Sequence, residues 1–204
     1  MESREKNTKE KILEEALKLF AQSGYMGTSM NDIASKLGVT KAALYKHYKS
    51  KQEILDSIIE KMNELDIERV KLYEMPEGDL EKVTAEYKET AFDKIKQFTK
   101  VQFLHWTEEE FSSCFRKMLT LEQYREPQMA QLYQNYLASG PLAYMEALFS
   151  GMLGDAEKAR QTALDFYGPI FLLYSIYDGA EDKSHVIKLL EEHMDYFLQE
   201  MQIS

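Results

Sequence analysis

The sequence is poor in the residues that cross-link, turn or kink a chain. Of its 204 residues, one is cysteine, nine are glycine and four are proline. The single cysteine, Cys114, excludes a disulfide within the chain and a cysteine-rich metal cluster. Glycine and proline are also too scarce for the many turns of a β-sandwich or β-barrel.

Long hydrophobic runs are missing as well. The most apolar stretch, residues 166–177, has 12 residues, whereas a membrane-spanning helix needs about 20. The N-terminal segment MESREKNTKEK is polar and lacks the apolar region of a secretory signal peptide. We therefore expect a cytoplasmic protein with no membrane partner.

Positive charge is in the minority. The chain has 25 Lys and Arg against 35 Asp and Glu, for a net charge of −10, which by itself disfavours nucleic acid as a partner. The charges are unevenly spread, however, because residues 1–52 carry a net +4 and residues 53–204 a net −14. This asymmetry predicts a small basic binding domain, 1–52, followed by a larger acidic domain, 53–204.

Helical periodicity is abundant. Apolar residues recur at steps of three and four, and no stretch alternates apolar and polar residues for long enough to be a confident strand. Asn7 or Thr8 can cap a first helix, and Gly24 is placed to end it. The pattern predicts an all-α fold of about nine helices: four within residues 8–72, followed by 80–106, 108–124, 128–152, 156–178 and 184–202.

Residues 29–48 contain two short predicted helices with a turn between them. Ser29 and Asp32 have the spacing of a capping box that opens the first helix, and Gly38 ends it. Thr40 can cap the second helix. This is the spacing of a helix-turn-helix, whose second helix can enter the major groove of DNA, although similar helix pairs occur in proteins that never touch DNA.

The composition around the second helix favours DNA. Residues 36–51 contain no acid and five lysines: Lys36, Lys41, Lys46, Lys49 and Lys51. Such a cluster is the electrostatic footprint of a nucleic-acid-binding surface. Ala42 and Ala43 allow close approach to the bases, and Tyr45 and His47 offer polar tips.

Several short motifs follow one another in order and without gaps in residues 8–55. They are ILEEALKLF in the first helix, Gly24-Tyr25, Thr28-Ser29 before Asp32-Ile33-Ala34, Leu37-Gly38-Val39, Leu44-Tyr45, and Lys51 before Ile54-Leu55. This segment resembles the N-terminal domain of TetR/AcrR-type transcriptional regulators. The resemblance implies an N-terminal three-helix DNA-binding domain and a larger helical domain that binds a small molecule and forms a homodimer. It also implies that the homodimer binds a palindromic DNA operator and usually represses a nearby gene or its own.

The resemblance assigns roles to individual residues. Positions that usually hold backbone phosphates are matched by Thr28, Ser29, Tyr45 and Lys51. Positions that face the groove are matched by Lys41, Ala42, Ala43, Lys46 and His47, with Thr40 at the start of the same helix. The family commonly has Gly or Ser before Thr-Leu-Tyr, where this sequence has Ala42-Ala43. Base recognition would therefore depend on Lys41 and on methyl contacts with thymine.

Two apolar stripes at steps of three or four follow the last two predicted helices. The residues predicted for a dimer interface are Ala163, Tyr167, Ile170, Tyr174, Ile187, Leu190, Met194 and Phe197. Two such helices from each subunit would form a four-helix bundle, the interface of a twofold-symmetric dimer. The same stripes would also serve to close the core of a single chain, and it is the family resemblance that favours dimerisation.

The middle helices are rich in aromatic residues and methionine, which suit a pocket for an apolar or planar ligand. At helical spacing, such residues more often form ordinary core. The predicted ligand-binding residues are Phe103, Trp106, Phe115, Met118, Tyr136, Tyr144 and Phe171. The resemblance implies that such a ligand releases a repressor from its operator.

An enzyme is not expected, because no nucleophile elbow, Walker loop, dinucleotide fingerprint or HExxH motif occurs, and no cofactor is implied. A metal sensor built on Cys114 and His105 lacks a third ligand, so no metal site is predicted. The acidic domain leaves one alternative open, a DNA-bound scaffold that recruits a protein partner without sensing a ligand.

Overall fold

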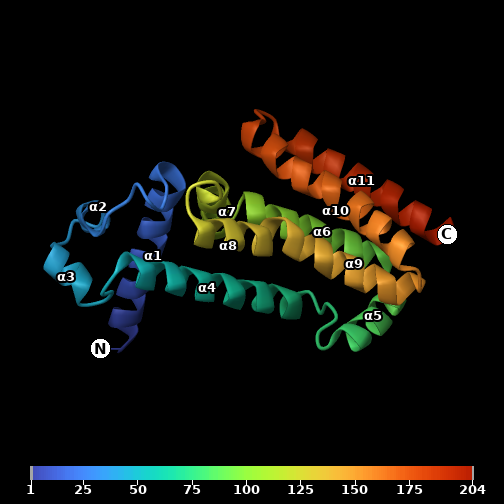
Figure 1. Ribbon diagram of the computed structural model, residues 1–204, viewed down its shortest axis with the longest axis horizontal. Helices are drawn as coiled ribbons and strands as arrows, with labels where there is room; N and C mark the ends of the chain where they lie inside the picture. Colours follow the sequence, from blue (N-terminus) through green and yellow to red (C-terminus); the bar gives the residue numbers. More distant parts are fainter. Residues whose placement is uncertain (1, 204) are drawn as a thin grey trace. The chain divides into compact units, whose positions relative to one another are not determined.

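The protein is all-helical, as its periodicity predicts. The computed structural model describes residues 2–203, with side chains described for residues 7–201. Within these limits it has no strand and eleven helices (Figure 1): α1 (Glu2–Ser23), α2 (Met30–Lys36), α3 (Lys41–Tyr45), α4 (Lys51–Leu72), α5 (Leu80–Glu89), α6 (Phe92–Thr107), α7 (Glu110–Glu122), α8 (Pro127–Leu137), α9 (Ser139–Leu153), α10 (Ala156–Gly179) and α11 (Lys183–Ile203). The predicted fold class is confirmed.

The helix count exceeds the predicted nine because two predicted helices are interrupted. The predicted helix 80–106 breaks after α5 at Thr90, which has an extended backbone (φ −77°, ψ 128°). The Thr90 hydroxyl donates to the carbonyl of Glu86 at 2.8 Å, a local bond that competes with continuation of the helix. The predicted helix 128–152 breaks between α8 and α9 at Ala138 (φ −124°, ψ −99°).

The chain forms two compact units, which are described separately. Unit 1 comprises the residues up to Arg69 together with Glu110–Tyr133, and unit 2 comprises Val70–Glu109 and the residues from Gln134 onwards. Compactness therefore groups α7 with the N-terminal helices. The boundary at residue 52 that the sequence predicts divides the chain by function rather than by compactness, and it stays a prediction.

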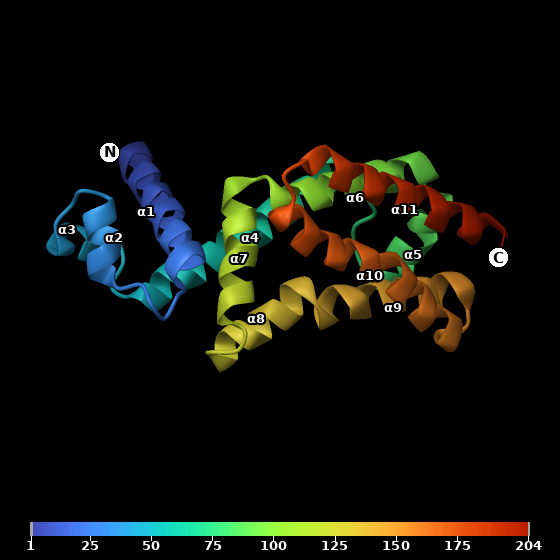
Figure 2. The same cartoon turned by 90° about the horizontal axis from the view of Figure 1, so that it is seen from above.

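Unit 1 is built around the apolar stripe of α1. The stripe residues are all buried: Ile12, Leu13, Ala16, Leu17 and Phe20. Helix α7 packs beside α1 (Figure 2), and Lys18 Nζ of α1 lies 3.0 Å from Glu110 Oε2 of α7. The prediction that Asn7 or Thr8 caps α1 is wrong, because the helix begins at Glu2 and the residues before Asn7 include no glycine or proline to stop it.

Unit 2 is a helical bundle in which α10 has the most neighbours. Helix α10 packs against α6, α9 and α11, and α5 packs against α9. Three aromatic rings meet in the core, since the centroid of Phe166 lies 5.1 Å from that of Phe197 and 6.0 Å from that of Phe149. An ion pair joins α6 to α11, with Lys100 Nζ 2.6 Å from Glu191 Oε1.

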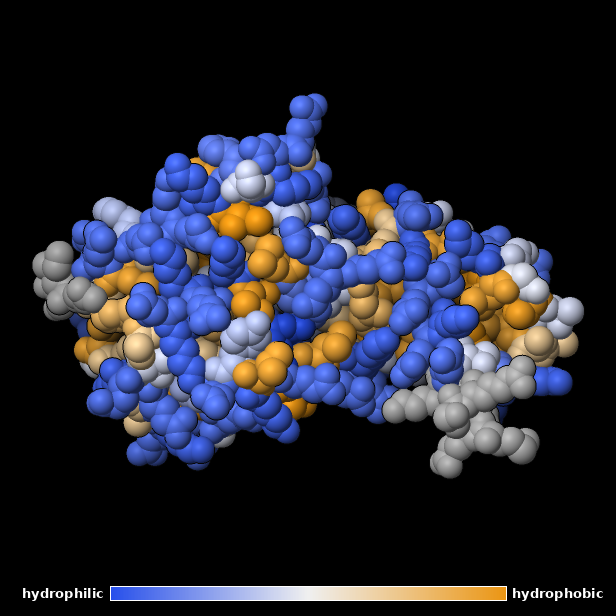
Figure 3. All heavy atoms as spheres, turned by 180° about the vertical axis from the view of Figure 1, so that it is seen from behind, coloured by the Kyte–Doolittle hydropathy of each residue, from blue (hydrophilic) through white to orange (hydrophobic). Residues whose placement is uncertain are grey.

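The described surface is mainly polar. None of the helices in residues 2–203 is long and apolar enough to cross a membrane. The face drawn in Figure 3 is largely hydrophilic, with separate apolar patches. Single exposed apolar side chains such as Leu72 and Tyr124 are ordinary on protein surfaces. Several apolar side chains exposed together on one face of a helix, by contrast, call for an explanation.

Candidate nucleic-acid interface

The loop between α1 and α2 is held closed by its own residues. Gly24 ends α1 with φ +82°, a left-handed backbone that glycine adopts without steric cost, and its N–H donates to Phe20 O at 3.0 Å. Thr28 is buried, and its hydroxyl donates to Gly24 O at 2.9 Å. The loop therefore brings the chain to α2 in a defined conformation.

Helix α2 begins with the predicted capping box. Ser29 Oγ accepts a hydrogen bond from Asp32 N at 3.2 Å, and Asp32 Oδ2 accepts one from Ser29 N at 2.8 Å. The Ser29 hydroxyl also donates to the same carboxylate oxygen at 2.6 Å. These bonds, the hydroxyl first and the N–H second, lower the pKa of Asp32 because they stabilise its charged form. Ser29 is exposed, but its hydroxyl and its N–H both donate to Asp32, so the phosphate contact predicted for Ser29 stays a prediction.

A tight turn separates α2 from α3. Gly38 adopts φ +67°, and the N–H of Val39 donates to a carbonyl of α2 at 3.0 Å. Thr40 then caps α3 as predicted, with its Oγ1 accepting from Ala43 N at 3.2 Å. Leu44 is completely buried and holds α3 on unit 1. Two capped helices with this turn between them form a helix-turn-helix.

The outward face of α3 carries the groups predicted to meet DNA. Lys41, Ala42, Tyr45 and Lys46 are exposed, whereas Ala43 and His47 are half-buried. Lys41 Nζ lies 5.8 Å from the centroid of the Tyr45 ring. This face therefore offers two ammonium groups and a phenol. Such donors fit the acceptors on guanine in the major groove and the phosphates beside it.

Lys51 acts inside unit 1. Its ammonium donates to Tyr25 O at 2.5 Å and to Thr28 O at 2.8 Å, and it lies 4.2 Å from the centroid of the Tyr25 ring. Burial lowers the pKa of Lys51, and the negative charge of Glu122 opposes that shift. Lys51 thus fastens the α1–α2 loop to the start of α4. The phosphate contacts predicted for Lys51 and Thr28 stay predictions, because both side chains already bind this loop.

Sequence reasoning did not anticipate the part that Glu122 has in unit 1. This residue of α7 is completely buried, with Oε1 3.2 Å from Arg125 NH1. Its Oε2 is buried and makes no hydrogen bond with the described residues. A Cβ added to Gly24 would lie 2.1 Å from Glu122 Oε1, so the carboxylate rests against the loop. No local signal reveals this contact, because the two residues are far apart in the sequence.

The seven predicted ligand-binding residues do not share one environment. Phe115 and Met118 lie on α7 in unit 1 and are completely buried. Tyr144 and Phe171 belong to unit 2, where both side chains are exposed. Tyr144 is nevertheless covered enough that burial raises the pKa of its phenol.

The other three predicted ligand-binding residues lie in an aromatic region of unit 2. The ring of Phe103 stacks on that of Tyr174 with a centroid distance of 5.2 Å. The rings of Trp106 and Tyr136 are 6.3 Å apart. Phe103 and Trp106 are both buried, and planar side chains of this kind can stack on a planar ligand or pack on an apolar one where a pocket admits it.

The predicted dimer stripes lie mainly inside unit 2. Six of the eight residues are buried in the single chain, namely Ala163, Ile170, Tyr174, Leu190, Met194 and Phe197, whereas Tyr167 and Ile187 are half-buried. The stripes thus close the core of the single chain, which is the alternative to dimerisation that the sequence left open. A different face of α10 carries exposed apolar side chains: Leu164, Phe171, Leu172 and Ile176.

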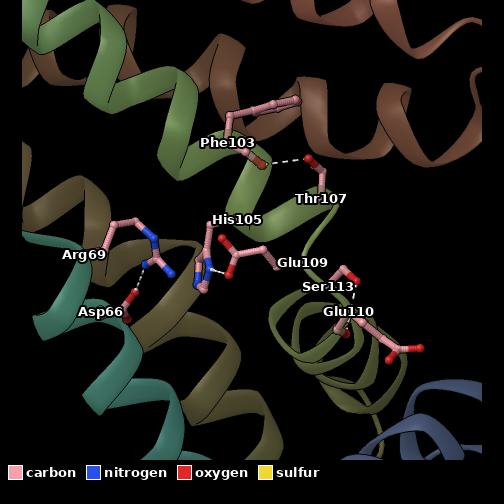
Figure 4. Close-up of polar contacts among 8 residues, drawn as sticks. All are labelled: Asp66, Arg69, Phe103, His105, Thr107, Glu109, Glu110 and Ser113. Carbon is pink, nitrogen blue, oxygen red and sulfur yellow. Dashed lines mark hydrogen bonds and ion pairs between the residues drawn. The ribbon is translucent and has the colours of Figure 1, made fainter. Parts of the chain in front are cut away.

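His105 and Cys114 have separate surroundings. His105 is buried on α6, and its Nδ1 lies 2.7 Å from Glu109 Oε2 (Figure 4). Cys114 is half-buried on α7, and burial raises the pKa of its thiol. In the part of the chain that the structure describes, no three His, Cys, Asp or Glu side chains gather where they could hold a metal ion.

The geometry of residues 24–51 defines a helix-turn-helix protein. A sequence model of the tetR family of bacterial regulatory proteins matches residues 12–58. The biofilm operon icaADBC negative transcriptional regulator IcaR of Staphylococcus epidermidis is 42% identical over 52 residues, which are 26% of this chain and 28% of IcaR. IcaR of Staphylococcus aureus strain Newman is 41% identical over 51 residues, 25% of this chain and 27% of its own. The chain thus spans about a quarter of the length of the curated relatives it matches.

Solved structures are similar over most of the chain. A transcriptional regulator from Aquifex aeolicus has a TM-score of 0.64 at 21% identity and covers 93% of this chain and 98% of its own. AibR in complex with isovaleryl coenzyme A and operator DNA has a TM-score of 0.60 at 20% identity, with 90% and 95% covered. At these identities the likeness shows the fold alone. Over residues 12–58 the chain is thus similar to the tetR family, and the predicted resemblance is confirmed for this segment.

Proposed function

We propose that the chain is a DNA-binding transcriptional regulator that represses its targets as a homodimer on a palindromic operator. The main support for this proposal is the outward face of α3. Lys41, Tyr45 and Lys46 are exposed there, on a helix that is held in place by the Thr40 cap and the buried Leu44. A helix with its side chains is about 10–12 Å across and the major groove is about 12 Å wide. The likeness to IcaR, a negative regulator, supports repression. Because operator DNA lies in the cytoplasm of bacteria, we place the protein there.

The roles of the interface residues follow from their chemistry. Lys41 and Lys46 donate to guanine edges, and the methyl groups of Ala42 and Ala43 contact thymine methyl groups. His47 completes this face. Ser29 and Tyr45 hold backbone phosphates, which orient the protein on the duplex without reading its sequence.

The first test measures binding to DNA from upstream of the protein's own gene by fluorescence anisotropy. Scrambled DNA of equal length is the control, and both are titrated across a salt series. Tighter binding to the upstream DNA, with affinity falling steeply as salt rises, supports the proposal. Binding to neither DNA at low salt would refute it.

We infer that the exposed apolar face of α10 is covered by a second copy of the chain. Leu164 and Phe171 are seven residues apart and Leu172 and Ile176 are four apart, both of them spacings of a helix face, and monomeric proteins seldom leave such a patch in water. A twofold axis would place the two α3 helices to read half-sites about 34–36 Å apart or a multiple of that. The exposed face of α10 thus replaces the buried stripes of α10 and α11 as the proposed contact.

Sedimentation equilibrium tests this dimer. Leu172→Glu places a charge on the face and is expected to give a monomer. The matched control is Leu72→Glu on α4, where the side chain is even more exposed, 76% against 59% for Leu172. An unchanged dimer in Leu172→Glu would exclude this face as the contact.

A small apolar or aromatic ligand is the third part of the proposal. AibR was solved with isovaleryl coenzyme A and operator DNA, which supports a regulator of this fold that meets both. We place the ligand at the aromatic region of unit 2 that contains Phe103, Trp106 and Tyr136. Helix α4 runs from the sequence of unit 1 into that of unit 2, and its shift would separate the two α3 helices from their half-sites. A tenfold loss of operator affinity needs about 1.4 kcal/mol of coupling, so the ligand must favour the DNA-free state by that amount.

Trp106 is the only tryptophan in the chain, so its fluorescence reports on the proposed ligand site. Isovaleryl coenzyme A and a panel of small apolar and aromatic compounds serve as probes, with coenzyme A as the control. A probe that changes this fluorescence and also releases DNA supports ligand sensing. DNA binding that responds to none of them would favour the protein-recruiting scaffold instead.

A further inference from the structure

A cleft of about 530 Å³ opens in unit 1 beside α3. One wall comes from the start of α1, through Asn7, Thr8 and Lys11, and another from α3 and the residues after it, which include His47. The apolar part of its lining, here named the floor, includes Ile12 and Val39. None of the described residues that line the cleft is acidic.

The polar rim of this cleft suits an anion. Lys11 is exposed and brings a full positive charge. The Nδ1 atom of His47 is buried and makes no hydrogen bond with the described residues. Buried polar atoms in native proteins almost always have a partner, so such an atom beside a cleft indicates a group that is still to bind. An imidazole nitrogen can donate to an anion when it carries the proton.

The position of the cleft indicates which anion reaches it. Ala43 and His47 belong both to the cleft and to the face proposed to read bases. A helix nearly fills the major groove, so groups on its flank meet the phosphates that border the groove. A phosphodiester also carries a deoxyribose, whose C–H surface matches an apolar floor.

We propose that this cleft receives a phosphodiester of the operator backbone. Lys11 and His47 hold the phosphate, and the deoxyribose lies on the floor that includes Ile12 and Val39. The inference rests on the proposed function and extends the DNA interface from α2 and α3 to the start of α1, which the sequence comparison with the family had not assigned to DNA.

The salt dependence of DNA binding tests the role of Lys11. One phosphate contact contributes about 0.9 to the slope of log affinity against log salt. Because the proposed dimer carries two copies of Lys11, we expect Lys11→Ala to reduce the slope by about twice that amount, roughly 1.8, on upstream and scrambled DNA alike. The loss of affinity between 50 and 200 mM salt would then be roughly twelvefold smaller than in the wild type. Lys82→Ala on α5 in unit 2 also removes an exposed positive charge and should leave the slope unchanged.

A second pair of variants probes the floor without removing a cation. Val39→Glu places a carboxylate at the cleft and should weaken binding to both DNAs well beyond the effect of Val39→Gln, which has nearly the same shape and no charge. Thermal unfolding of each variant checks that unit 1 remains folded. A melting temperature like that of the wild type assigns the loss to the interface.

The outcomes separate this inference from the function on which it rests. If the wild type prefers the upstream DNA but Lys11→Ala keeps the full slope and the two Val39 variants bind equally, the cleft does not hold a phosphate and the regulator stands. If the wild type binds no DNA at low salt, both proposals fall.

Discussion

The contact between Gly24 and Glu122 predicts a stability effect that separates backbone strain from steric clash. In Gly24→Ala, the first contribution to the loss of stability is backbone strain. The left-handed backbone at φ +82° costs an L-residue about 1–2 kcal/mol. The second is the new Cβ, which would lie 2.1 Å from Glu122 Oε1, far inside any normal contact. Because Glu122 is completely buried, its carboxylate cannot swing into solvent. Overpacking of this kind typically costs a further 1–3 kcal/mol or so.

Gly38 provides the control for strain alone. It has φ +67°, and an added Cβ would meet nothing within 4 Å. Gly38→Ala should therefore lower the free energy of unfolding by about 1–2 kcal/mol. Gly24→Ala should lower it by about 2–5 kcal/mol, the sum of strain and clash.

Urea unfolding of a double-mutant cycle measures the clash directly. Glu122→Ala removes the carboxylate, so in that background the cost of Gly24→Ala should fall to that of Gly38→Ala. The coupling energy is then about 1–3 kcal/mol, within the range found for residues in contact. Equal costs of Gly24→Ala in both backgrounds would refute the contact between α7 and the α1–α2 loop.

Further predictions concern single side chains. Lys41→Ala should relax base preference at particular positions by about 1–3 kcal/mol in anisotropy titrations of operator variants, whereas a uniform loss would make it a phosphate contact. Tyr45→Phe should weaken binding to operator and scrambled DNA alike, and unchanged affinity would remove its phosphate role. Lys51→Met should lower the free energy of unfolding by about 1.5–3 kcal/mol, the contribution of hydrogen bonds from a charged group. It should keep the wild-type slope of log DNA affinity against log salt, whereas a smaller slope would support the predicted phosphate contact. Burial, together with a hydrogen bond to Glu108, raises the pKa of Tyr177 to about 12, so the stability this phenol contributes is complete below its ordinary pKa of 10.0 and is lost as the pH rises toward 12. As the pH rises over this range, the free energy of unfolding measured by urea titration should fall less in Tyr177→Phe than in the wild type. An equal fall in both proteins would contradict the raised pKa.

Local signals predicted the helix-turn-helix well. The Ser29–Asp32 capping box, the Gly38 turn and the Thr40 cap all occur where the sequence places them. A cap or a left-handed glycine acts within three or four residues, so its effect can be read without knowledge of the fold. The buried stripe of α1 was predictable for the same reason, because its spacing matches one helical turn.

Local signals were less complete at the ends of helices. A capping box forms only in part at the start of α4: Ser50 Oγ accepts from Glu53 N at 3.1 Å, but the Glu53 carboxylate accepts from Lys49 N at 2.6 Å. The periodicity of apolar residues also did not predict the break at Ala138. The helical spacing of apolar side chains continues across this break, so the sequence pattern alone does not reveal it.

By itself, the sequence determined the all-α class, the helix-turn-helix and the basic character of its outer face. These depend on neighbours along the chain and on composition. Only the tertiary structure decided that the stripes of α10 and α11 are core, that Lys51 binds loop carbonyls, and that Glu122 rests on Gly24. An apolar stripe or a charged side chain has the same sequence signature whether it faces its own chain or a partner. Which of the two it meets depends on packing between segments far apart in the sequence.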